Sequence, residues 1–400
     1  MPLLNATWPW SWSTLPVWAS GQGATDFSEA DVRLLTRYPV MWTQGQRLGP
    51  DGWITDNRTG YTNYENATES DARKIHAAHG DEPVFSYYGF MGSCNGYSNW
   101  WWPQFNSSAS SELWLRGDDG RVCYSDTDHP PLPAPGSPKR GPLYDLCKPA
   151  MMRYYRETIL SSVMGSAHVG GSFFDEVDHV ELMHQSSYWF GCRLSSESQQ
   201  RIATCWRSAM ANLTEWMAEH GKWAIMSTQA YVHQHPEWHE AQLAMLRRTG
   251  SFYYLEALCP DFAPSPKGHW MCGAFTDRVS CCLDQIATIE RFTGSTPPVP
   301  TMIRAQVAGG EGEQAGGGYF DFLLGTFLVV ASERSYVAFG QGWSGPQTSF
   351  PWFEAYDRPL GRPLGPKRVL STAYGVFTRS FEHLDVAVNV SNWSATLTPR

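Results

Sequence analysis

The chain repeats one pattern along most of its length, a short apolar run bounded by glycine, proline or polar residues and usually followed by a helical segment. Runs of this length suit buried strands of a parallel sheet. Strands that alternate with helices predict a parallel sheet covered by helices. The runs lie at 15–21, 38–44, 83–89, 170–174, 223–228, 251–257, 300–306 and 335–340. Eight such units predict an α/β fold, a (β/α)8 TIM barrel.

The expected barrel covers residues 1–350 and contains a long insertion at 90–143. The insertion carries the triplet Trp100-Trp101-Trp102, a predicted hairpin at 112–124 and a proline-rich stretch. Insertions of this length in a compact domain are usually functional or disordered. Residues 351–400 differ, because short strand-like runs follow one another there. They predict a small C-terminal antiparallel β domain.

The run before residue 175 ends abruptly in carboxylates, Asp175, Glu176 and Asp178. Barrels of this type place their chemistry at the carboxyl ends of the strands. A solvated acidic loop is the alternative, since most carboxylates lie at the surface. Neighbouring residues of a regular strand point to opposite faces, so only one of Asp175 and Glu176 should face a substrate. We favour Asp175, with Glu176 as the competitor.

Other expected strand ends add polar and aromatic groups. Glu256 follows the sixth run and Arg304 ends the seventh. Two carboxylates across a cleft are what glycosidic bond cleavage requires, about 5 Å apart for retention and roughly 6.5–9.5 Å for inversion. Arg304 could clamp a substrate or a carboxylate, or form a structural ion pair. The candidate substrate-binding residues are Arg304, Trp42, Tyr88, Trp100, Trp101, Trp102 and Gln229; the aromatic ones could equally pack in the core or in loops.

The amino-acid composition restricts the classes of partner that the protein is expected to bind. The net charge of −9 argues against nucleic acid and anionic membranes. Exposed aromatic faces stack on sugar rings or on bases, and the acidic balance of a chain with 19 tryptophans favours sugars. The most apolar run, residues 320–331, is too short to span a bilayer.

The nine cysteines include no Cys-x-x-Cys pair, which argues against a zinc ribbon or a redox motif. Together with N-glycosylation sequons they predict a glycoprotein of the secretory pathway or vacuolar lumen, with up to four disulfides. A cytosolic protein with buried thiols is the alternative. No signal peptide is visible at Met1. The sequons are Asn5, Asn57, Asn66, Asn106, Asn212, Asn389 and Asn392.

His233 and His235 form a His-x-His pair after the fifth run. A metal-dependent hydrolase is therefore a further alternative, although no matching ligand set is spaced nearby. We expect no metal and no cofactor.

Several segments resemble predicted TIM-barrel glycoside hydrolases. In these, a Tyr-Asp-Leu-x-x-Pro helix precedes a Gly-x-Phe-x-Asp strand, as residues 144–149 and 171–175 do here. Residues 74–88 and 361–389 resemble the same group, which is broadly similar to the α-galactosidase and α-glucosidase superfamily. There the nucleophile is an Asp after the fourth strand and the acid/base a carboxylate after the sixth. The resemblance places these roles on Asp175 and Glu256, although the second residue is Glu here and not Asp.

These observations predict a secreted glycosidase of carbohydrate metabolism that cleaves an oligo- or polysaccharide through two carboxylates, with retention. A carbohydrate-binding barrel without catalysis is the principal alternative.

Overall fold

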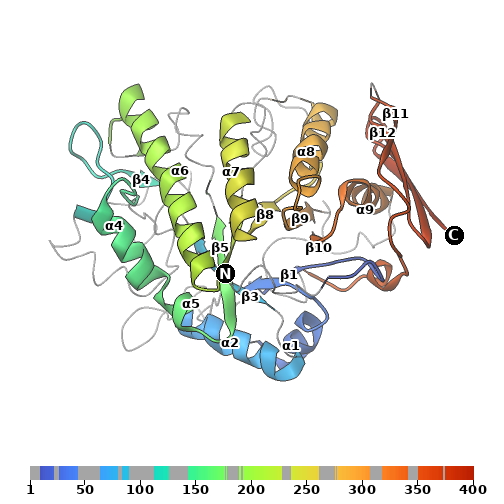
Figure 1. Ribbon diagram of the computed structural model, residues 1–400, viewed down its shortest axis with the longest axis horizontal. Helices are drawn as coiled ribbons and strands as arrows, with labels where there is room; N and C mark the ends of the chain where they lie inside the picture. The colour runs from blue at the N-terminus through green and yellow to red at the C-terminus, as the bar shows by residue number, and fades with distance from the viewer. Residues whose placement is uncertain are drawn as a thin grey trace. The chain divides into compact units, whose positions relative to one another are not determined.

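The computed structural model describes 15 stretches of the chain (Figure 1). They are residues 10–21, 27–43, 64–79, 83–89, 112–125, 143–175, 177, 189–190, 192–227, 236–260, 275, 277–306, 318–340, 350–372 and 374–400. No helix in these stretches is both long and apolar enough to cross a membrane.

Eight strands form one sheet in the order β1-β2-β3-β5-β7-β8-β9-β10. Val17, two residues before β1, forms a parallel bridge with Val337 of β10, so the sheet closes. The predicted (β/α)8 barrel is confirmed, and each of the eight runs overlaps one strand. The strands are β1 (Ala19–Ser20), β2 (Met41–Thr43), β3 (Val84–Gly89), β5 (Val169–Asp175), β7 (Trp223–Ser227), β8 (Phe252–Leu255), β9 (Thr301–Gln306) and β10 (Ser335–Gly340).

The chain forms two compact units, each with part of this sheet. One comprises residues 22–28 and 42–227 and holds β3, β5 and β7; the other comprises 1–21, 29–41 and 228–400 and holds β8, β9 and β10. The helices of the first unit are α2 (Tyr64–His79), α4 (Pro149–Tyr154), the π-helical turn η3 (Tyr155–Ile159), α5 (Ser161–Gly165) and α6 (Ser196–Glu219). Those of the second are α1 (Glu29–Leu35), α7 (Pro236–Thr249), α8 (Arg278–Thr293), α9 (Gly318–Val330) and the 3-10 turn η6 (Glu354–Asp357).

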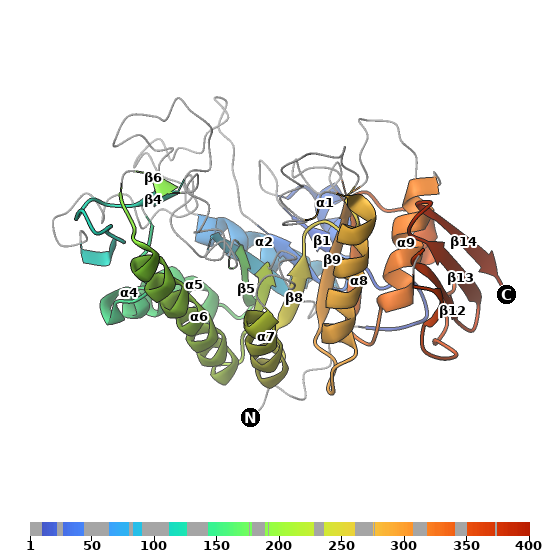
Figure 2. The same ribbon diagram turned by 90° about the horizontal axis from the view of Figure 1, so that it is seen from above.

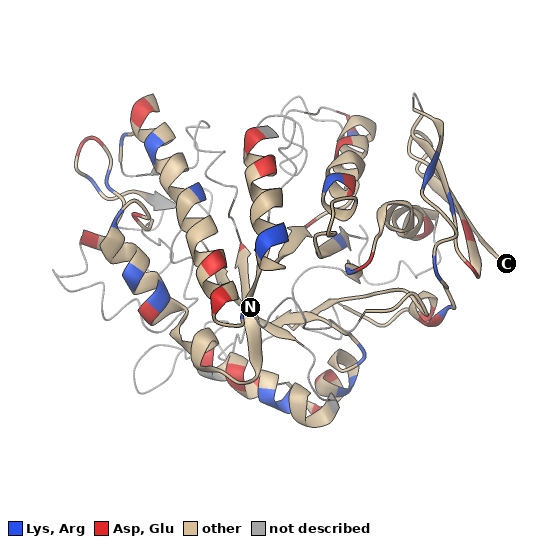
Figure 3. Ribbon diagram, viewed as in Figure 1, with Lys and Arg blue, Asp and Glu red and all other residues tan. Residues whose placement is uncertain are grey.

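The strands are buried because both faces are covered, which explains their continuous apolar runs. Every residue of β8 and β10 is buried. The outer helices are amphipathic, and α6, α7 and α8 each carry both acidic and basic side chains (Figure 3). α9 is the exception, with ten of its 13 residues buried. Its sequence is apolar because other elements pack against several of its sides.

A separate antiparallel sheet covers α9 within the second unit (Figure 2). Gly325 of α9 needs its missing side chain, because a Cβ there would press on Ala395 and Val388. The predicted C-terminal β domain is confirmed as a sheet in the order β11-β12-β13-β14. Its strands are β11 (Arg368–Ser371), β12 (Val376–Ser380), β13 (Leu384–Asn389) and β14 (Ser394–Pro399). The division of the chain at residue 350 stays a prediction.

The structure differs from expectation in local detail. The sequence predicts a short helix from Ala72 to His79, but α2 begins at Tyr64, because its first two turns are polar and resemble a loop. The sequence also predicts one helix from Pro149 to about Met164, but η3 and Leu160, whose φ of −88° and ψ of 0° leave the helical region, interrupt it. β11 was not expected, since its residues are largely exposed and lack an apolar pattern. The hairpin at 112–124 is confirmed by an antiparallel bridge between Arg116 and Val122. The short strands β4 (Tyr124–Ser125) and β6 (Trp189–Phe190) pair with each other.

Three disulfides join described cysteines, as expected for a disulfide-bonded protein. They link Cys123 to Cys192, Cys147 to Cys205 and Cys259 to Cys282. Cys281 is also disulfide-bonded, to a cysteine outside the described residues. Disulfides of this number are compatible with a secreted protein.

Candidate active-site carboxylates

Asp175 is the last residue of β5, and the local sequence explains its position. Gly171 allows β5 to approach β7 closely, because a Cβ there would clash with the Trp223 carbonyl oxygen. The next apolar residues, Phe173 and Phe174, are buried. The ladder with β3 then places Asp175 opposite Gly89. The Asp175 carboxylate is therefore positioned by a strand whose register is fixed on both sides.

Tyr87 of β3 holds this carboxylate. Its hydroxyl donates a hydrogen bond to Oδ2 of Asp175 at 2.6 Å, and Asp175 itself is half-buried. The Tyr87 ring stacks on Phe173 at 5.5 Å between centroids. The arrangement suits a carboxylate that must keep one orientation.

Trp42 and Tyr88, two predicted sugar platforms, lie in the core. Trp42 is 1% exposed and stacks on Phe173 at 4.7 Å. The Tyr88 hydroxyl lies 3.1 Å from Oγ of Ser162 on α5, and burial raises the pKa of Tyr88 well above its ordinary value. Neither ring has a face open to a ligand, so both pack the interior.

Glu256 follows β8 directly, and its side chain is 17% exposed. Since it is no longer in the strand ladder, other contacts must hold its loop. The amide of Leu258 donates to the Arg304 carbonyl oxygen at 2.9 Å. The Tyr319 hydroxyl donates to the Cys259 carbonyl oxygen at 2.9 Å. The loop after Glu256 is thereby fastened to β9 and α9.

Helix α8 supplies the strongest hold on this loop. Gln285 is fully buried; its Oε1 accepts from the amide of Cys259 at 2.6 Å, and its Nε2 donates to the Ala257 carbonyl oxygen at 2.9 Å. The Cys259–Cys282 disulfide ties the loop to the same helix. Cys259 has φ of 44°, in the left-handed region that costs a non-glycine residue about 1 kcal/mol or more. The side-chain hydrogen bonds and the covalent link together keep the loop in this conformation.

Arg304 of β9 is the cation nearest to Glu256. Its Nη1 lies 3.6 Å from Oε1 of Glu256, and its own side chain is completely buried. Burial lowers the pKa of the Arg304 guanidinium, whereas Tyr254 and Glu256 act to raise it. A guanidinium has no neutral form within the usual pH range, so Arg304 presents a permanent positive charge to Glu256.

The remaining predicted site residues fall outside the described stretches. They are Glu176, Trp100, Trp101, Trp102, Gln229, His233 and His235. Within the described stretches no group of three or more His, Cys, Asp or Glu side chains is arranged to hold a metal ion. The question of Asp175 against Glu176 is therefore not decided by geometry, although Asp175 has a defined hydrogen-bond partner.

Two residues with defined contacts at these carboxylates were not predicted. Tyr87 and Tyr88 are neighbours in β3 and point to opposite faces of the strand. This alternation alone does not say which of the two contacts Asp175. Gln285 lies in a helix 26 residues beyond Cys259. A polar amide on the apolar face of α8 was the available signal, since a buried amide must find partners.

No curated protein matches the chain in sequence. Among solved structures the chain is similar to Amy13B of Eubacterium rectale, with a TM-score of 0.46 and 11% identity over 94% of this chain and 86% of that one. It is similar to the alpha-N-acetylgalactosaminidase NagBb of Bifidobacterium bifidum, with a TM-score of 0.47 and 8% identity over 96% of this chain and 57% of that one. The debranching enzyme of Nostoc punctiforme gives a TM-score of 0.42 and 10% identity over 95% and 88%. Similarity at this level does not extend to substrate or mechanism.

One family model matches the chain, over residues 284–385, from within α8 into β13. Its description is hypothetical glycosyl hydrolase family 15. The match agrees with the resemblance to TIM-barrel glycoside hydrolases that the sequence motifs indicate, and it supports a glycoside hydrolase.

Proposed function

We propose that the protein is a retaining glycoside hydrolase of oligo- or polysaccharides, with Asp175 as nucleophile and Glu256 as general acid/base. One observation carries the proposal: each carboxylate stands at the carboxyl end of a strand of a closed parallel sheet, where such barrels carry their catalytic groups. Asp175 also has an orienting partner in Tyr87, and Glu256 lies beside the Arg304 guanidinium, which stabilises its ionised form.

The reaction proceeds in two steps. The Asp175 carboxylate attacks the anomeric carbon and forms a covalent glycosyl ester, while Glu256 gives its proton to the departing glycosidic oxygen. Glu256, now ionised, takes a proton from water, and the resulting attack on the ester releases the sugar and restores both carboxyl groups. Tyr87 keeps Oδ2 of Asp175 in place through its hydrogen bond.

Arg304 acts through Glu256 in this scheme. Because its guanidinium is buried, it does not reach a substrate itself; it stabilises the ionised Glu256 that exists between the two steps. Four proposed substrate contacts lie outside the described residues: Trp100, Trp101, Trp102 and Gln229. Glu176, which also lies outside them, remains the alternative to Asp175. No cofactor takes part in this mechanism.

The setting we propose is the secretory pathway or the cell exterior, with N-glycans on some of the sequons. Asn212 and Asn392 are exposed and Asn389 is half-exposed. Glycans at such positions extend into solvent without displacing the core. Mass spectrometry before and after endoglycosidase treatment would detect them.

The experiment is turnover on a panel of aryl glycosides and oligosaccharides by the wild type, Asp175→Asn and Glu256→Gln. Loss of a catalytic carboxylate should lower kcat by about 10²–10⁴-fold. Glu157→Gln is a matched control, because Glu157 is an exposed carboxylate of η3, and it should keep the full rate. Azide should restore turnover to Asp175→Gly with inversion, and to Glu256→Gly, on activated substrates, with retention, which separates the two roles.

Unchanged rates in both carboxylate variants would remove the assignment. Binding without turnover by the wild type would instead favour the carbohydrate-binding barrel. Activity that is lost on chelation and restored by a metal would favour the metal-dependent hydrolase.

A further inference from the structure

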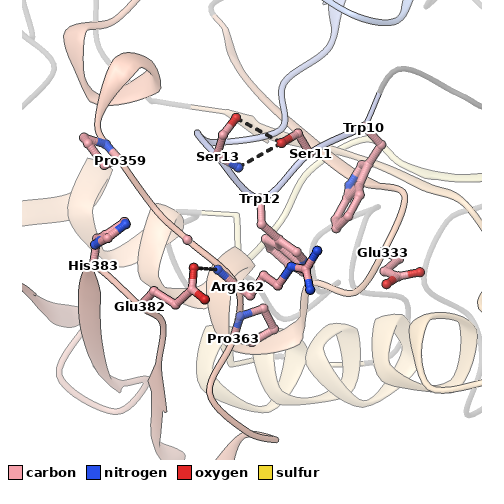
Figure 4. A pocket seen from close by; sticks show the side chains of 11 residues that line it. Trp10, Ser11, Trp12, Ser13, Glu333, Pro359, Arg362, Pro363, Glu382 and His383 are labelled. Atoms are coloured by element: carbon pink, nitrogen blue, oxygen red, sulfur yellow. Dashed lines mark hydrogen bonds between the residues drawn. The ribbon is translucent and has the colours of Figure 1, made fainter.

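A cavity of about 720 Å³ lies at the junction of the N-terminal arm and the C-terminal sheet (Figure 4). Its walls come from residues 10–13, from Glu333, from Pro359, from residues 361–363 and from Glu382 and His383. All of these belong to one compact unit of the chain. The volume lies within the roughly 300–1,000 Å³ that is typical of small-molecule sites.

The cavity lies at the opposite end of the strands from Glu256. Glu333 precedes β10, and Nε1 of Trp10 donates to the carbonyl oxygen of Ser335, the first residue of β10, at 3.4 Å. Glu256 follows the carboxyl end of β8, which runs parallel to β9, as β10 does. A ligand in the cavity therefore lies at the amino ends of the strands, where barrels do not place catalytic groups.

Two tryptophans form the aromatic part of the lining. Trp12 is buried and packs edge-on against Trp10 at 4.7 Å between centroids, and against Phe381 at 5.6 Å. Trp10 is only half-buried, and its indole N–H is used by Ser335. The ring of Trp10 is thus held in a fixed orientation and keeps apolar surface on the cavity. A fixed, amphipathic indole is a low-entropy platform for a ring with both apolar and polar edges.

Arg362 supplies a charged donor on the same cavity. Its backbone is held by two hydrogen bonds of 3.0 Å, from its amide to Oε2 of Glu382 and from the Glu382 amide to its carbonyl oxygen. Gly361 before it has φ of 74°, which this tight turn requires. The Arg362 side chain is exposed, and no hydrogen bond or ion pair joins its guanidinium to any residue of the described stretches. In Figure 4 it extends toward the side of the cavity on which Trp10 and Glu333 lie.

The mixture of groups defines the ligand. Arg362 can donate hydrogen bonds to a ligand, while Glu333 and Glu382 can accept them. Two carboxylates against one guanidinium make an anionic ligand unfavourable. A neutral polyhydroxylated ring satisfies donors and acceptors together and offers C–H surface to Trp10. We propose that this cavity is a second binding site, for a neutral saccharide, separate from Glu256.

The proposal goes beyond the proposed catalytic function and is tested by binding alone. The protein is Glu256→Gln, so that a bound glycan is not consumed, and the probe is an array of neutral and sialylated oligosaccharides. The strongest neutral binder is then titrated by calorimetry. We expect Trp10→Ala to weaken its binding about tenfold or more, and Arg362→Ala to weaken it several-fold. Arg358→Ala is the matched control, since Arg358 is exposed on the same segment but outside the cavity, and should bind as the parent does.

Arg362→Ala also guards against misfolding, because the side chain it removes is exposed and has no described partner; its melting temperature should equal that of the parent. In the wild-type background, both cavity variants should hydrolyse a small aryl glycoside at the parental rate. Binding that survives both substitutions, a preference for sialylated probes, or no binding to any probe overturns the proposal. Loss of turnover with binding retained would instead bear on the catalytic proposal only.

Discussion

The ends of β5 and β8 hold their carboxylates by different means. Asp175 is still part of β5, so the ladder to Gly89 fixes its backbone, and the Tyr87 hydroxyl donates to its side chain. Glu256 lies beyond β8. Its loop is held by a disulfide, by both ends of the Gln285 amide and by the Tyr319 hydroxyl.

The difference follows from where a parallel ladder stops. A strand residue gains precise placement from backbone hydrogen bonds that it shares with its neighbours, so little more is needed. A loop residue loses that placement, and side chains from helices must restore it. The two sites should therefore respond differently to mutation. Glu256 should be sensitive to changes in the residues that hold its loop, and Asp175 to changes in the residues that contact its side chain.

The largest expected effect comes from the disulfides. In the chain-entropy account, the Cys147–Cys205 link, with a separation of 58 residues, contributes about 4 kcal/mol to the free energy of unfolding, and Cys259–Cys282, with 23 residues, about 3 kcal/mol. Cys147→Ala with Cys205→Ala should thus cost more stability, measured by urea unfolding. Its kcat should stay unchanged, because that link joins the segment before α4 to α6 and not a carboxylate loop.

Removal of the Cys259–Cys282 disulfide should cost less stability but should lower kcat, because it frees the loop after Glu256. Double alanine variants of the two pairs, compared at a temperature where both are folded, give the test. Equal kcat values would show that the covalent link does not position Glu256.

The next effect is that of Gln285→Leu. It leaves the Cys259 amide and the Ala257 carbonyl without their partner, and each such buried group costs about 1–3 kcal/mol. We expect a loss of about 2 kcal/mol in unfolding free energy after relaxation, together with a lower kcat and an unchanged KM. Urea unfolding and steady-state kinetics measure the two.

Gln242→Leu is the matched control. Gln242 of α7 is fully buried, and neither end of its amide has a hydrogen-bond partner in the described part of the chain. Its removal should leave stability unchanged or raise it, because replacing an unsatisfied buried amide relieves a desolvation cost. A similar loss at both positions would mean that Gln285 acts only through packing volume.

How much of this could be predicted from the sequence depends on the range of the interaction. The strands were predictable, because a buried parallel strand is a local apolar run, and Asp175 and Glu256 were candidates because a carboxylate at the end of such a run is conspicuous. Tyr88 was chosen in place of Tyr87 because both lie in one apolar run, and only the register against β5 shows that Tyr87 meets Asp175. Trp42 was a candidate for sugar stacking and equally for core packing, because an aromatic residue in a strand carries no local sign of whether it is buried; the structure buries it.

The Gln285 support was beyond reach for another reason. It joins residues 26 and 28 positions apart across a loop and a helix turn, and sequence alone gives no geometry for such a contact. Its signal, one amide on a buried helix face, is shared by Gln242, which has no hydrogen-bond partner among the described residues. The residue type alone does not distinguish an amide that holds a loop through hydrogen bonds from one that does not.

Tyr87→Phe should have a moderate effect confined to chemistry. A hydrogen bond to a charged group contributes about 1.5–3 kcal/mol, and its loss from the transition state would lower kcat roughly tenfold or more. Tyr88→Phe is the control on the same strand, since its hydroxyl meets Ser162 in the core; it should reduce stability slightly and leave kcat unchanged. The reverse pattern would show that Tyr88, and not Tyr87, supports catalysis.

The smallest expected effect concerns the start of β5. Nζ of Lys222 donates to the carbonyl oxygens of Ser166 and Val169 at 2.7 and 2.6 Å. Burial lowers the pKa of Lys222 below its ordinary 10.5, although Glu69 acts to raise it. The folded state therefore binds this proton less tightly than the unfolded chain does. The resulting gain in stability is complete above about pH 10.5 and is lost as the pH falls through the lower, folded pKa.

The measurement is the unfolding free energy of the wild type relative to Lys222→Arg, from about pH 8 to 10.5. The wild type should gain on the variant as the pH rises, because a guanidinium does not titrate in this window. The difference should be small, since Lys222 is only partly buried and solvent screens its charge. A flat difference would mean that burial does not lower the pKa of Lys222, and that the lysine at the start of β5 is as well solvated as one on the surface.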